Sequence, residues 1–363
     1  MRVLTVNPGS SSLKISVLED DDSLVGHAEL STGPVRRESE VLAGALAGLP
    51  APDAVGVRFV HGGAEYRGPV LIDDRVTERL HELADLAPLH QPLSLYALGE
   101  IRRELPDLPV VACFDTAFHA GMPDAAATFA LPAAWRERFG LRRYGFHGLS
   151  HSYAVRRAGR LLGADPAALR TVVCHLGAGA SLAAVAGGRS VDTTMGFTPM
   201  DGLVMATRPG SLDPGLLLWL LAQGISAAEL QETLTRRSGL RALAGTGDMR
   251  EIRRRAAEGD ADARLALAVY LHRLRGCIAA MTAALGGMDA LVFTGGVGEH
   301  DARLRREVAE GLAYLGVAVD ERANGSARGD ADVTAPGAAV RTLVVTSRED
   351  LEIAAGVRRV LGR

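Results

Sequence analysis

The first candidate for chemistry in this sequence is a serine-rich turn followed by a lysine. The segment Asn7-Pro-Gly-Ser-Ser-Ser12 separates two short apolar stretches, and its backbone N–H groups can form an anion-binding nest. In the alternating stretch that follows, Lys14 projects on the same side as Ser12. Lys14 is the only lysine among the 40 lysine and arginine residues, and its compact ammonium suits a point charge. A compositional bias of the genome explains the lone lysine equally well, so the phosphate site stays a hypothesis.

Two further glycine-rich turns follow predicted strands. His175-Leu-Gly-Ala-Gly-Ala-Ser181 comes after the apolar residues 171–174, and Thr294-Gly-Gly-Val-Gly-Glu299 comes after 291–293. The last turn precedes an amphipathic helix near 301–315, and a helix N-terminus favours bound phosphate. Hairpin turns are rich in glycine for steric reasons alone, so each turn is weak evidence by itself. Three such turns in one chain favour phosphate or nucleotide binding.

Two arginines and two histidines stand in sequence contexts that require a partner. Arg58 lies on or beside a predicted strand, and Arg208 lies in a long apolar loop that contains two prolines. Because an unpaired buried charge is costly, each arginine needs either an internal carboxylate or an anionic ligand. His147 and His151 are four residues apart, but the glycines around His147 favour a turn and no carboxylate stands at ligand spacing. We therefore do not expect a zinc site.

The remaining motifs exclude several enzyme classes. The only lysine follows Leu13, so the chain has no Walker A loop and no protein-kinase lysine. No GxGxxG opens a helix, and neither GxSxG nor HExxH occurs. If this protein handles phosphate, it uses another architecture.

Composition predicts a soluble, cytoplasmic protein. The formal net charge is −3, which gives no electrostatic basis for a nucleic-acid partner. The three cysteines form no CxxC pair and suit a reducing compartment. The longest apolar run, residues 216–222, is far shorter than the ~20 residues that cross a bilayer, and the N-terminus does not resemble a secretory signal. We expect neither a membrane nor a nucleic acid as partner.

The hydrophobic pattern distributes these residues over strands and helices. Strands are expected at 3–6, 13–18, 109–115, 171–174, 182–185, 291–293 and 342–346, and a long helix is expected at 261–285. Ser347-Arg-Glu-Asp350 has the spacing of a capping box before a final helix. The stretch 19–54 is polar, is punctuated by glycine and proline, and is expected to be rich in loops.

Length and repetition predict two domains of the α/β class. A chain of 363 residues exceeds the roughly 250–300 residues at which a single core stops growing. A strand, a glycine-rich turn and a second strand occur near 3–18 and again near 171–185, which suggests two related lobes that face one cleft. Asp115 ends a buried strand, and α/β sheets bind their ligands at such strand ends.

Taken together, these segments resemble the acetate kinase, or acetokinase, family over the whole chain. The landmarks are Asn7-Pro-Gly-Ser-Ser-Ser-Leu-Lys14, Arg58-Phe-Val-His-Gly-Gly63, Ala87-Pro-Leu-His90, Phe114-Asp-Thr-Ala-Phe-His119, Tyr144-Gly-Phe-His-Gly-Leu-Ser-His151, Thr194-Met-Gly-Phe-Thr-Pro199, Arg208, Phe293-Thr-Gly-Gly-Val-Gly-Glu299 and Glu349. The resemblance implies a homodimer with an actin/Hsp70-like ATPase fold, in which two related lobes enclose a central cleft. It implies an N-terminal lobe of residues 1–118 and 350–363 and a nucleotide-binding C-terminal lobe of residues 119–349.

The reaction implied by this resemblance is the reversible transfer of a phosphoryl group from ATP to acetate, which gives ADP and acetyl phosphate. The cofactor implied is Mg²⁺, with Mn²⁺ as an alternative. A small carboxylate is already ionised at pH 7 and needs no general base. The difficulty is to bring it up to an anionic γ-phosphoryl group, so catalysis should rest on positioning and on cations around a loose transition state.

The resemblance assigns roles to individual residues of this chain. The catalytic roles fall on Arg58, Asp115, His147 and Arg208, and the Mg²⁺ shell falls on Asn7 and Glu349. The arginines would bind the carboxylate and the transferring oxygens, the histidine would donate to those oxygens, and the aspartate would orient the arginines or the substrate. The acyl pocket would comprise Val60, Leu89, Phe146 and Pro199. Nucleotide or phosphate binding would involve Ser10, Ser12, Lys14, His175, Gly177, Gly179, Asp248, Arg250, Gly296, Gly298 and Glu299. Such an apolar pocket discriminates poorly against one extra methylene, so propionate is expected as a second substrate.

The chain departs from the family pattern mainly on the nucleotide side. Where the family usually has Asn, this chain has Gln91, Ala178, His300 and Arg348, and the family's Gly is Ala206. Ala178 and His300 both fall on the nucleotide side, and Ala178 removes a side-chain donor near the phosphates. ATP is the default donor, and pyrophosphate or another nucleotide is the alternative.

The same two-lobed fold is also compatible with two other classes of protein. A non-catalytic nucleotide switch of the Hsp70 or actin type would leave Arg58, His147 and Arg208 without a role. A sugar kinase needs a carboxylate base against a neutral hydroxyl and a polar sugar pocket, whereas this pocket is expected to be small and apolar.

Overall fold

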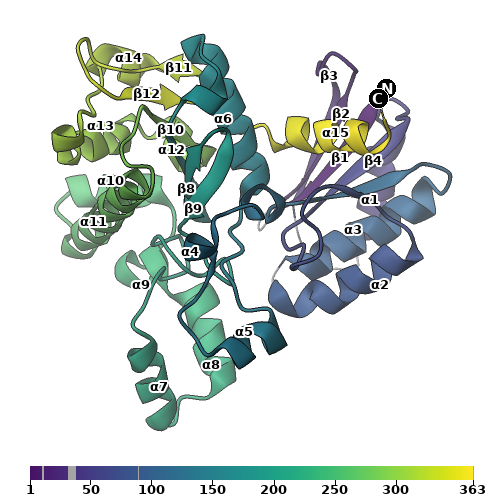
Figure 1. Cartoon of the computed structure of the whole chain (residues 1–363), viewed down its shortest axis with the longest axis horizontal. Helices are drawn as coiled ribbons and strands as arrows, with labels where there is room; N and C mark the ends of the chain where they lie inside the picture. Colours follow the sequence, from purple (N-terminus) through teal and green to yellow (C-terminus); the bar gives the residue numbers. More distant parts are fainter. Residues whose placement is uncertain (10–11, 32–37, 89, 363) are drawn as a thin grey trace. The chain divides into compact units, whose positions relative to one another are not determined.

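Each of the two strand–turn–strand segments of the sequence opens a six-stranded sheet. A computed structural model describes residues 1–9, 12–31, 38–88 and 90–362 (Figure 1). Contacts divide the chain into two units. The first comprises Met1–Ala120, Phe146–Tyr153 and Arg348–Arg363, and the second comprises Gly121–Gly145 and Ala154–Ser347.

The sheet of the first unit has the strand order β3-β2-β1-β4-β6-β5. Its strands are β1 (Val3–Pro8), β2 (Ser12–Leu18), β3 (Leu24–Ser31), β4 (Ala54–Phe59), β5 (Val70–Leu71) and β6 (Val110–Phe114). The strands β1, β2 and β3 are antiparallel neighbours, β1, β4 and β6 run parallel, and β5 closes the edge in antiparallel sense. Short, valine-rich segments of this kind favour strands because their branched side chains pack well on a pleated surface.

Helices cover both faces of this sheet (Figure 1). They are α1 (Glu38–Ala47), α2 (Asp74–Glu82), α3 (Gln91–Glu104) and, at the C-terminus, α15 (Glu349–Val360). Leu4 and Val6 point to the core shared with the first three helices, whereas Val3 lies with Ile353 and Val357 of α15. The alternation of side chains along the strand therefore sets which helix each face receives.

The sheet of the second unit repeats the same plan, with the order β9-β8-β7-β10-β12-β11. Its strands are β7 (Thr171–Leu176), β8 (Ala180–Ala186), β9 (Arg189–Thr193), β10 (Ala290–Thr294), β11 (Ala331–Asp332) and β12 (Arg341–Val344). The first three strands are again antiparallel, the next two run parallel, and the edge strand is antiparallel. Matching order and sense in both sheets confirm the prediction of two related α/β lobes.

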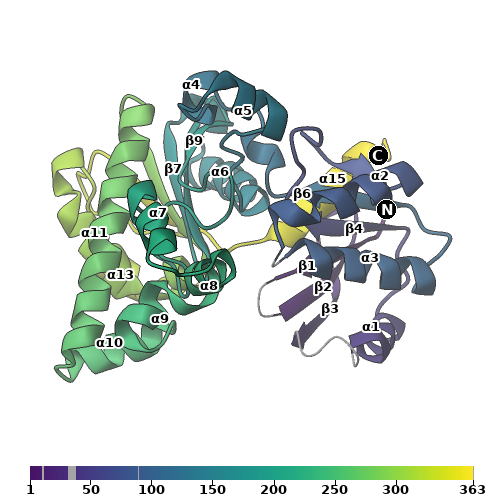
Figure 2. The same cartoon turned by 90° about the horizontal axis from the view of Figure 1, so that it is seen from below.

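Most of the remaining helices belong to the second unit. They are α4 (Asp124–Ala127), α5 (Ala133–Phe139), α6 (Gly148–Leu162), α7 (Pro214–Ala222), α8 (Ala227–Glu232), α9 (Gly239–Ala244), α10 (Met249–Ala257), α11 (Ala261–Ala284), α12 (Gly295–His300), α13 (Ala302–Gly311) and α14 (Glu321–Ser326). Short 3₁₀ turns occur at Leu83–Leu86, Ala117–His119, Pro166–Ala168 and Ala313–Leu315, and a π-helical turn at Thr233–Arg237. Figure 2 shows α11 running beside the second sheet, with α10 next to it. No described helix is both long and apolar enough to cross a membrane.

Two local expectations were wrong. The stretch 19–54 contains β3 and α1, so it is less rich in loops than its polar composition indicates. The final helix begins at Glu349, but Arg348 takes the cap position and no side chain caps the helix, so the capping box does not form. Arg348 instead pairs with the Asp350 carboxylate at 2.9 Å, and that pairing occupies the residue that the motif needs.

The division of the chain differs from the expected boundaries of 1–118 with 350–363, and 119–349. The main difference is the segment Phe146–Tyr153, which carries His147 and belongs to the first unit. Gly148 N donates to the carbonyl oxygen of Asp115 at 3.0 Å, and His119 Nε2 donates to that of Phe146 at 3.0 Å. These hydrogen bonds attach the segment to the first sheet, which a boundary drawn along the sequence misses.

Candidate active site

A bidentate ion pair lies at the ends of two neighbouring parallel strands of the first unit. Arg58 stands on β4 and Asp115 directly follows β6. Arg58 Nε donates to Asp115 Oδ1 at 2.9 Å and Nη2 donates to Oδ2 at 2.6 Å. Arg58 is 9% exposed and Asp115 is 1% exposed, so both charges are held in a fixed, largely buried geometry. The strand-end position expected for Asp115 is therefore a site of buried charge.

The third nitrogen of the same guanidinium joins two further polar groups. Arg58 Nη1 donates to Asn7 Oδ1 at 2.9 Å and to Glu349 Oε2 at 3.3 Å, and Asn7 Nδ2 donates to that carboxylate oxygen at 2.6 Å. Asn7 comes from β1, next to β4 in the sheet, and Glu349 opens α15. One guanidinium thus faces two carboxylates, and the cluster carries one net negative charge.

The carboxylates keep this guanidinium charged. Burial by itself lowers the pKa of Arg58, but the charges of Asp115 and Glu349 more than offset it and raise the pKa above its ordinary value. Burial raises the pKa of Asp115, and the Arg58 guanidinium acts in the opposite direction. A cluster with a permanent cation and two acidic partners is organised to hold its geometry rather than to move protons.

His147 is held in a strained conformation beside this cluster. Its φ of 55° lies in the left-handed region, which non-glycine residues seldom adopt. The backbone N–H of His147 bonds to the Asp115 carboxylate, and a Cβ on Gly148 would lie 2.0 Å from the carbonyl oxygen of Asp115. Only glycine fits at 148 because the backbone passes so close to the strand end. Three of the four predicted catalytic residues are therefore brought together in the first unit.

Apolar and histidine side chains surround Phe146 in the same unit. Val60 and Phe146 are both buried, and the rings of His61 and Phe146 have their centroids 5.5 Å apart. Burial lowers the pKa of His119 to about 4, which keeps its ring neutral. Throughout the described ranges, no three His, Cys, Asp or Glu side chains form a metal-binding group. Leu89, predicted for the acyl pocket, lies outside the described residues.

Arg208, the fourth predicted catalytic residue, belongs to the second unit and has a different environment. Its side chain is largely buried, and Nη1 donates to the carbonyl oxygen of Pro199 at 2.7 Å. Among the residues that the structure describes, no carboxylate pairs with it. Burial accordingly lowers the pKa of Arg208 to about 10. A buried guanidinium whose described surroundings hold no counter-ion is suited to bind an anion.

Backbone hydrogen bonds fix the loop that carries Arg208. Ser238 N donates to the carbonyl oxygen of Thr207 at 3.0 Å and Leu240 N to that of Met205 at 2.9 Å, so the loop rests on the start of α9. Gly239 lies between these donors with φ of 63°, and a Cβ there would lie 2.2 Å from the Met205 oxygen. The close approach of two backbones therefore positions Arg208.

A pocket of about 400 Å³ lies in the first unit, and a second pocket of about 590 Å³ lies in the second unit. The larger pocket is the candidate nucleotide site. It is lined by Gly177, Ala178, Leu240, Gly247, Asp248, Met249, Arg250, Arg253, Tyr270, Gly296, Val297, His300 and Asp301. Four predicted nucleotide-binding residues are among them: Gly177, Asp248, Arg250 and Gly296. Two of the five departures from the family pattern, Ala178 and His300, also line it.

Several other predicted nucleotide residues are not part of this lining. Glu299 Oε1 accepts from Gly295 N and Ser347 N, both at 2.9 Å, so its carboxylate holds backbone. His175, Gly179 and Gly298 lie in or beside the same turns without lining the pocket. Lys14 and Ser12 belong to β2 of the first unit, where Ser12 Oγ donates to the Glu29 carboxylate at 2.6 Å. Ser10 lies outside the described residues.

Sequence reasoning missed several residues of the nucleotide pocket. Arg253 and Tyr270 lie within the helices α10 and α11, where the helical pattern gives no sign of a site. Gly247 directly precedes Asp248, the N-cap of α10 and a predicted nucleotide-binding residue. This adjacency in the sequence is the signal that could have identified Gly247 as part of the pocket.

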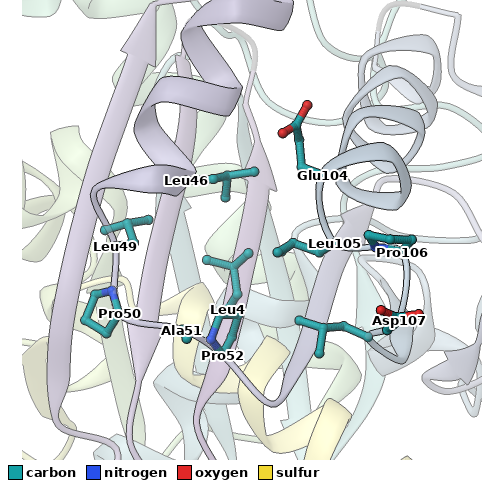
Figure 3. Close-up of a pocket in the computed structure, with 11 residues that line it drawn as sticks. Leu4, Leu46, Leu49, Pro50, Ala51, Pro52, Glu104, Leu105, Pro106 and Asp107 are labelled. Atoms are coloured by element: carbon teal, nitrogen blue, oxygen red, sulfur yellow. The ribbon is translucent and has the colours of Figure 1, made fainter.

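The smaller pocket is apolar and contains none of the predicted site residues (Figure 3). It lies between the ends of α1 and α3, with Leu4, Leu46, Leu49 and Leu105 around it and Glu104 and Asp107 on one side. We assign it no part in the site.

Comparisons with known proteins show which family this chain belongs to. The model of the acetokinase family matches residues 47–355. The acetate kinase of Nostoc punctiforme is 48% identical over 304 residues, which cover 83% of this chain and 75% of that protein. The crystal structure of Porphyromonas gingivalis acetate kinase is 34% identical, covers 99% of both chains and has a TM-score of 0.89. That of a propionate kinase from Francisella tularensis is 32% identical, with the same coverage and a TM-score of 0.90.

The family match covers most of the chain, and the solved structures align over nearly all of it. On these grounds, the chain belongs to the acetokinase family.

Proposed function

We propose that this protein catalyses the reversible transfer of the γ-phosphoryl group of ATP to acetate, which gives acetyl phosphate and ADP. Membership of the acetokinase family supports a kinase that acts on a carboxylate. The observation that carries the proposal is Arg208, a buried guanidinium whose described surroundings supply no carboxylate. An anionic substrate would supply the missing partner.

The reaction needs positive charge more than it needs an acid or a base. Acetate is ionised at neutral pH and attacks a phosphoryl group that is itself anionic, so mutual repulsion is the main barrier. A cation in a water-poor site stabilises the developing charge far more than it would in water. Arg208 suits this role because its charge has not been neutralised in advance.

Arg58, Asp115 and His147 have a supporting role in this proposal. The Arg58 guanidinium is already held by Asp115, Asn7 and Glu349, so it keeps a fixed orientation from which it contacts the reactants. Asp115 also binds the backbone N–H of His147 and so sets the position of that residue. We assign the His147 ring as a donor to the transferring phosphoryl oxygens.

We assign Asn7 and Glu349 to the shell of a Mg²⁺ ion, with Mn²⁺ as an alternative. Their amide and carboxylate oxygens are ligands that a hard cation prefers, and the net negative charge of the cluster favours a cation. Mg²⁺ usually takes only one or two protein ligands and completes its shell with water and substrate phosphates. When bound, the ion would neutralise part of the charge on the phosphates.

Mn²⁺ binding in the presence of ADP, followed by electron paramagnetic resonance, should weaken in Glu349→Gln.

The phosphoryl donor is proposed to be a nucleotide. The second-unit pocket has a volume of about 590 Å³, within the range of cofactor sites and larger than pyrophosphate requires. Ala178 and His300 line it in place of two asparagines of the family pattern, so a change in donor preference is the alternative. Initial rates with ADP, GDP and inorganic phosphate against acetyl phosphate distinguish these donors.

Propionate is proposed as a second substrate. A neighbouring solved structure is that of a propionate kinase, and Val60 and Phe146 provide buried apolar surface. One extra methylene changes binding by only about 1–3 kcal/mol in such pockets. Comparing kcat/KM for acetate and propionate tests this assignment.

The protein is proposed to be a cytoplasmic homodimer that uses α7 as part of its interface. No residue of α7 is buried, and Leu218 and Trp219 are 69% and 58% exposed. An exposed apolar helix of this kind marks an interaction surface, and a second copy of the chain is the partner we propose. Light scattering should show a dimer for the wild type and a monomer for L218E/W219E. Leu265→Glu, on a leucine of α11 that is 54% exposed, should leave the dimer intact. The cytoplasmic location is supported by the three free cysteines, because unpaired thiols suit a reducing compartment.

Trapping acetyl phosphate as its hydroxamate tests the proposed activity directly. Product should form only when ATP, acetate and Mg²⁺ are all present. Binding of ATP without product would instead favour a nucleotide switch.

A further inference from the structure

The segments that line the nucleotide pocket include the start of α10 and the helix α12. Met249 and Arg250 lie at the start of α10, whereas Gly296, Val297 and His300 belong to α12. Residues 251–295, which include the whole of α11, separate these two segments in the chain. The shape of the pocket therefore depends on contacts that hold the two segments together.

Arg253, one turn further along α10, makes such a contact. Its Nε donates to Asp301 Oδ2 at 2.8 Å, and its Nη1 lies 2.8 Å from Glu307 Oε2. Asp301 directly follows α12, and its other oxygen accepts from Leu304 N at 2.9 Å to cap α13. One carboxylate thus joins α10 to the end of α12 and the start of α13.

The ion pairs of Arg253 are shielded from solvent. The side chains of Arg253, Asp301 and Glu307 are 12%, 17% and 18% exposed. Buried pairs are screened less than surface pairs, so they hold geometry more strongly. Arg253 Nη1 and Nη2 are buried and make no hydrogen bond within the described ranges, so the contact with Glu307 is an ion pair only. Arg253 lines the pocket, but these two nitrogens are covered by protein, so we assign its effect on a ligand to the groups that it positions.

We propose that Arg253 is a positioning residue of the nucleotide pocket, whose ion pairs with Asp301 and Glu307 hold α10 and α12 at the separation that binds the nucleotide. The inference rests on the proposed function, because it takes this pocket as the nucleotide site. Without the guanidinium, two largely buried carboxylates on the α12–α13 side lose their common cation. The turn that carries Val297 and His300 then loses its link to Met249 and Arg250.

The test compares nucleotide binding with the handling of acetate in Arg253→Met. Calorimetry measures the Kd for ADP, and initial rates give KM for ATP, KM for acetate and kcat. The Kd for ADP and the KM for ATP should rise by about tenfold or more. At saturating ATP, kcat and the KM for acetate should stay within about twofold of the wild type. A general loss of structure would not separate the two substrates in this way.

Two further variants and one control sharpen the test. Asp301→Asn removes the charge but keeps the helix cap, because asparagine caps helices as well as aspartate does. It should weaken ADP binding in the same direction, and Arg253→Lys should restore part of the affinity lost in Arg253→Met. Arg254→Met is the matched control, since Arg254 is the next residue of α10, is 60% exposed and pairs with Glu258. Its Kd for ADP should equal that of the wild type.

Three outcomes would overturn the inference. One is an unchanged Kd for ADP in folded Arg253→Met, or in Asp301→Asn if the first variant does not fold. Another is an equal rise in the KM values for ATP and acetate, which would make Arg253 a general structural residue. If the wild-type protein binds no ADP, the proposed function fails as well, and that result is distinct from the other two.

Discussion

Two arginines of this protein have opposite electrostatic surroundings, and this difference determines what each can do. Arg58 is bonded to Asp115 and lies beside Glu349, so its charge is more than balanced. Arg208 bonds only to the carbonyl oxygen of Pro199 among the described residues. The first arginine is held in a fixed position by carboxylates, and the second is available to an anion.

Replacing Arg58 should therefore destabilise the protein. Arg58→Met leaves Asp115 and Glu349 without their cation, and breaking a buried pair in this way costs about 3–5 kcal/mol. Urea unfolding followed by circular dichroism measures the loss. Arg103→Met removes an arginine whose side chain is 51% exposed and should change the free energy of unfolding little. Equal stability of the two variants would contradict the role given to the cluster.

His119 should make the stability of the protein depend on pH. Its pKa is about 4 in the fold, against an ordinary value of 6.5, because burial disfavours the charged ring. Between these values the unfolded chain binds a proton that the folded chain does not. Stability should therefore fall as the pH falls from 6.5 to 4, by up to about 1.4 kcal/mol per pH unit from this residue. In His119→Gln, urea unfolding should show a shallower dependence over that window, and an unchanged slope would refute the assignment.

The residue types of the site could be predicted from the sequence, but their partners could not. The sequence alone does not distinguish Arg58 from Arg208, because each lies in an apolar context that requires either a carboxylate or an anionic ligand. The carboxylates that bind Arg58 lie 57 and 291 residues away in the chain, and such distances leave no local pattern. Glu299 was predicted to bind nucleotide, yet its carboxylate accepts backbone N–H groups.

At the scale of elements, the start of α6 lies in close backbone contact with the residue that follows β6. A Cβ on Gly148 would lie 2.0 Å from the Asp115 carbonyl oxygen, which accepts a hydrogen bond from Gly148 N. The two elements can adopt this arrangement only while the backbone at 148 carries no side chain.

Gly148→Ala should therefore displace His147 and lower activity. The new methyl group must push the start of α6 away from the strand end, and misplacing catalytic groups by about 1 Å can cost about 100-fold in rate. Initial rates of hydroxamate formation measure this effect. Gly99→Ala is the control, because that helical position has open space and alanine favours helices over glycine by about 0.5–1 kcal/mol. Full activity in Gly148→Ala would show that this junction does not position the site.

The elements were easier to predict where their pattern was strong. The hairpin of β1 and β2 and the long helix α11 appear close to their expected limits, because alternating and helical periodicities are local properties. Strand β3 and helix α1 were not expected, because the charged residues, glycines and prolines around their apolar residues give the stretch 19–54 the composition of a loop. The capping box failed because Arg348 pairs with Asp350 instead.

At the scale of the whole molecule, the two units share one sheet topology but differ in the charge of their polar clusters. Both sheets share the same order and sense of strands, so the duplication was predictable from the repeated strand–turn–strand segments. The first unit holds a cluster with one net negative charge, which suits a cation. The second unit holds Arg208 and a pocket lined by glycine-rich turns, which suit an anionic nucleotide and carboxylate. The proposed reaction uses both kinds of charge.

The measurement that tests this account most directly is a parallel determination of kcat/KM and unfolding free energy for Arg208→Met. Because Arg208 is buried and has no carboxylate partner in the part of the chain that the structure describes, removing its charge should leave the free energy of unfolding unchanged or raise it. Loss of its cation should lower kcat/KM for acetate by about 100-fold or more. Turnover at the wild-type level, or a stability loss as large as that of Arg58→Met, would contradict the claim that Arg208 is kept uncompensated for an anionic substrate.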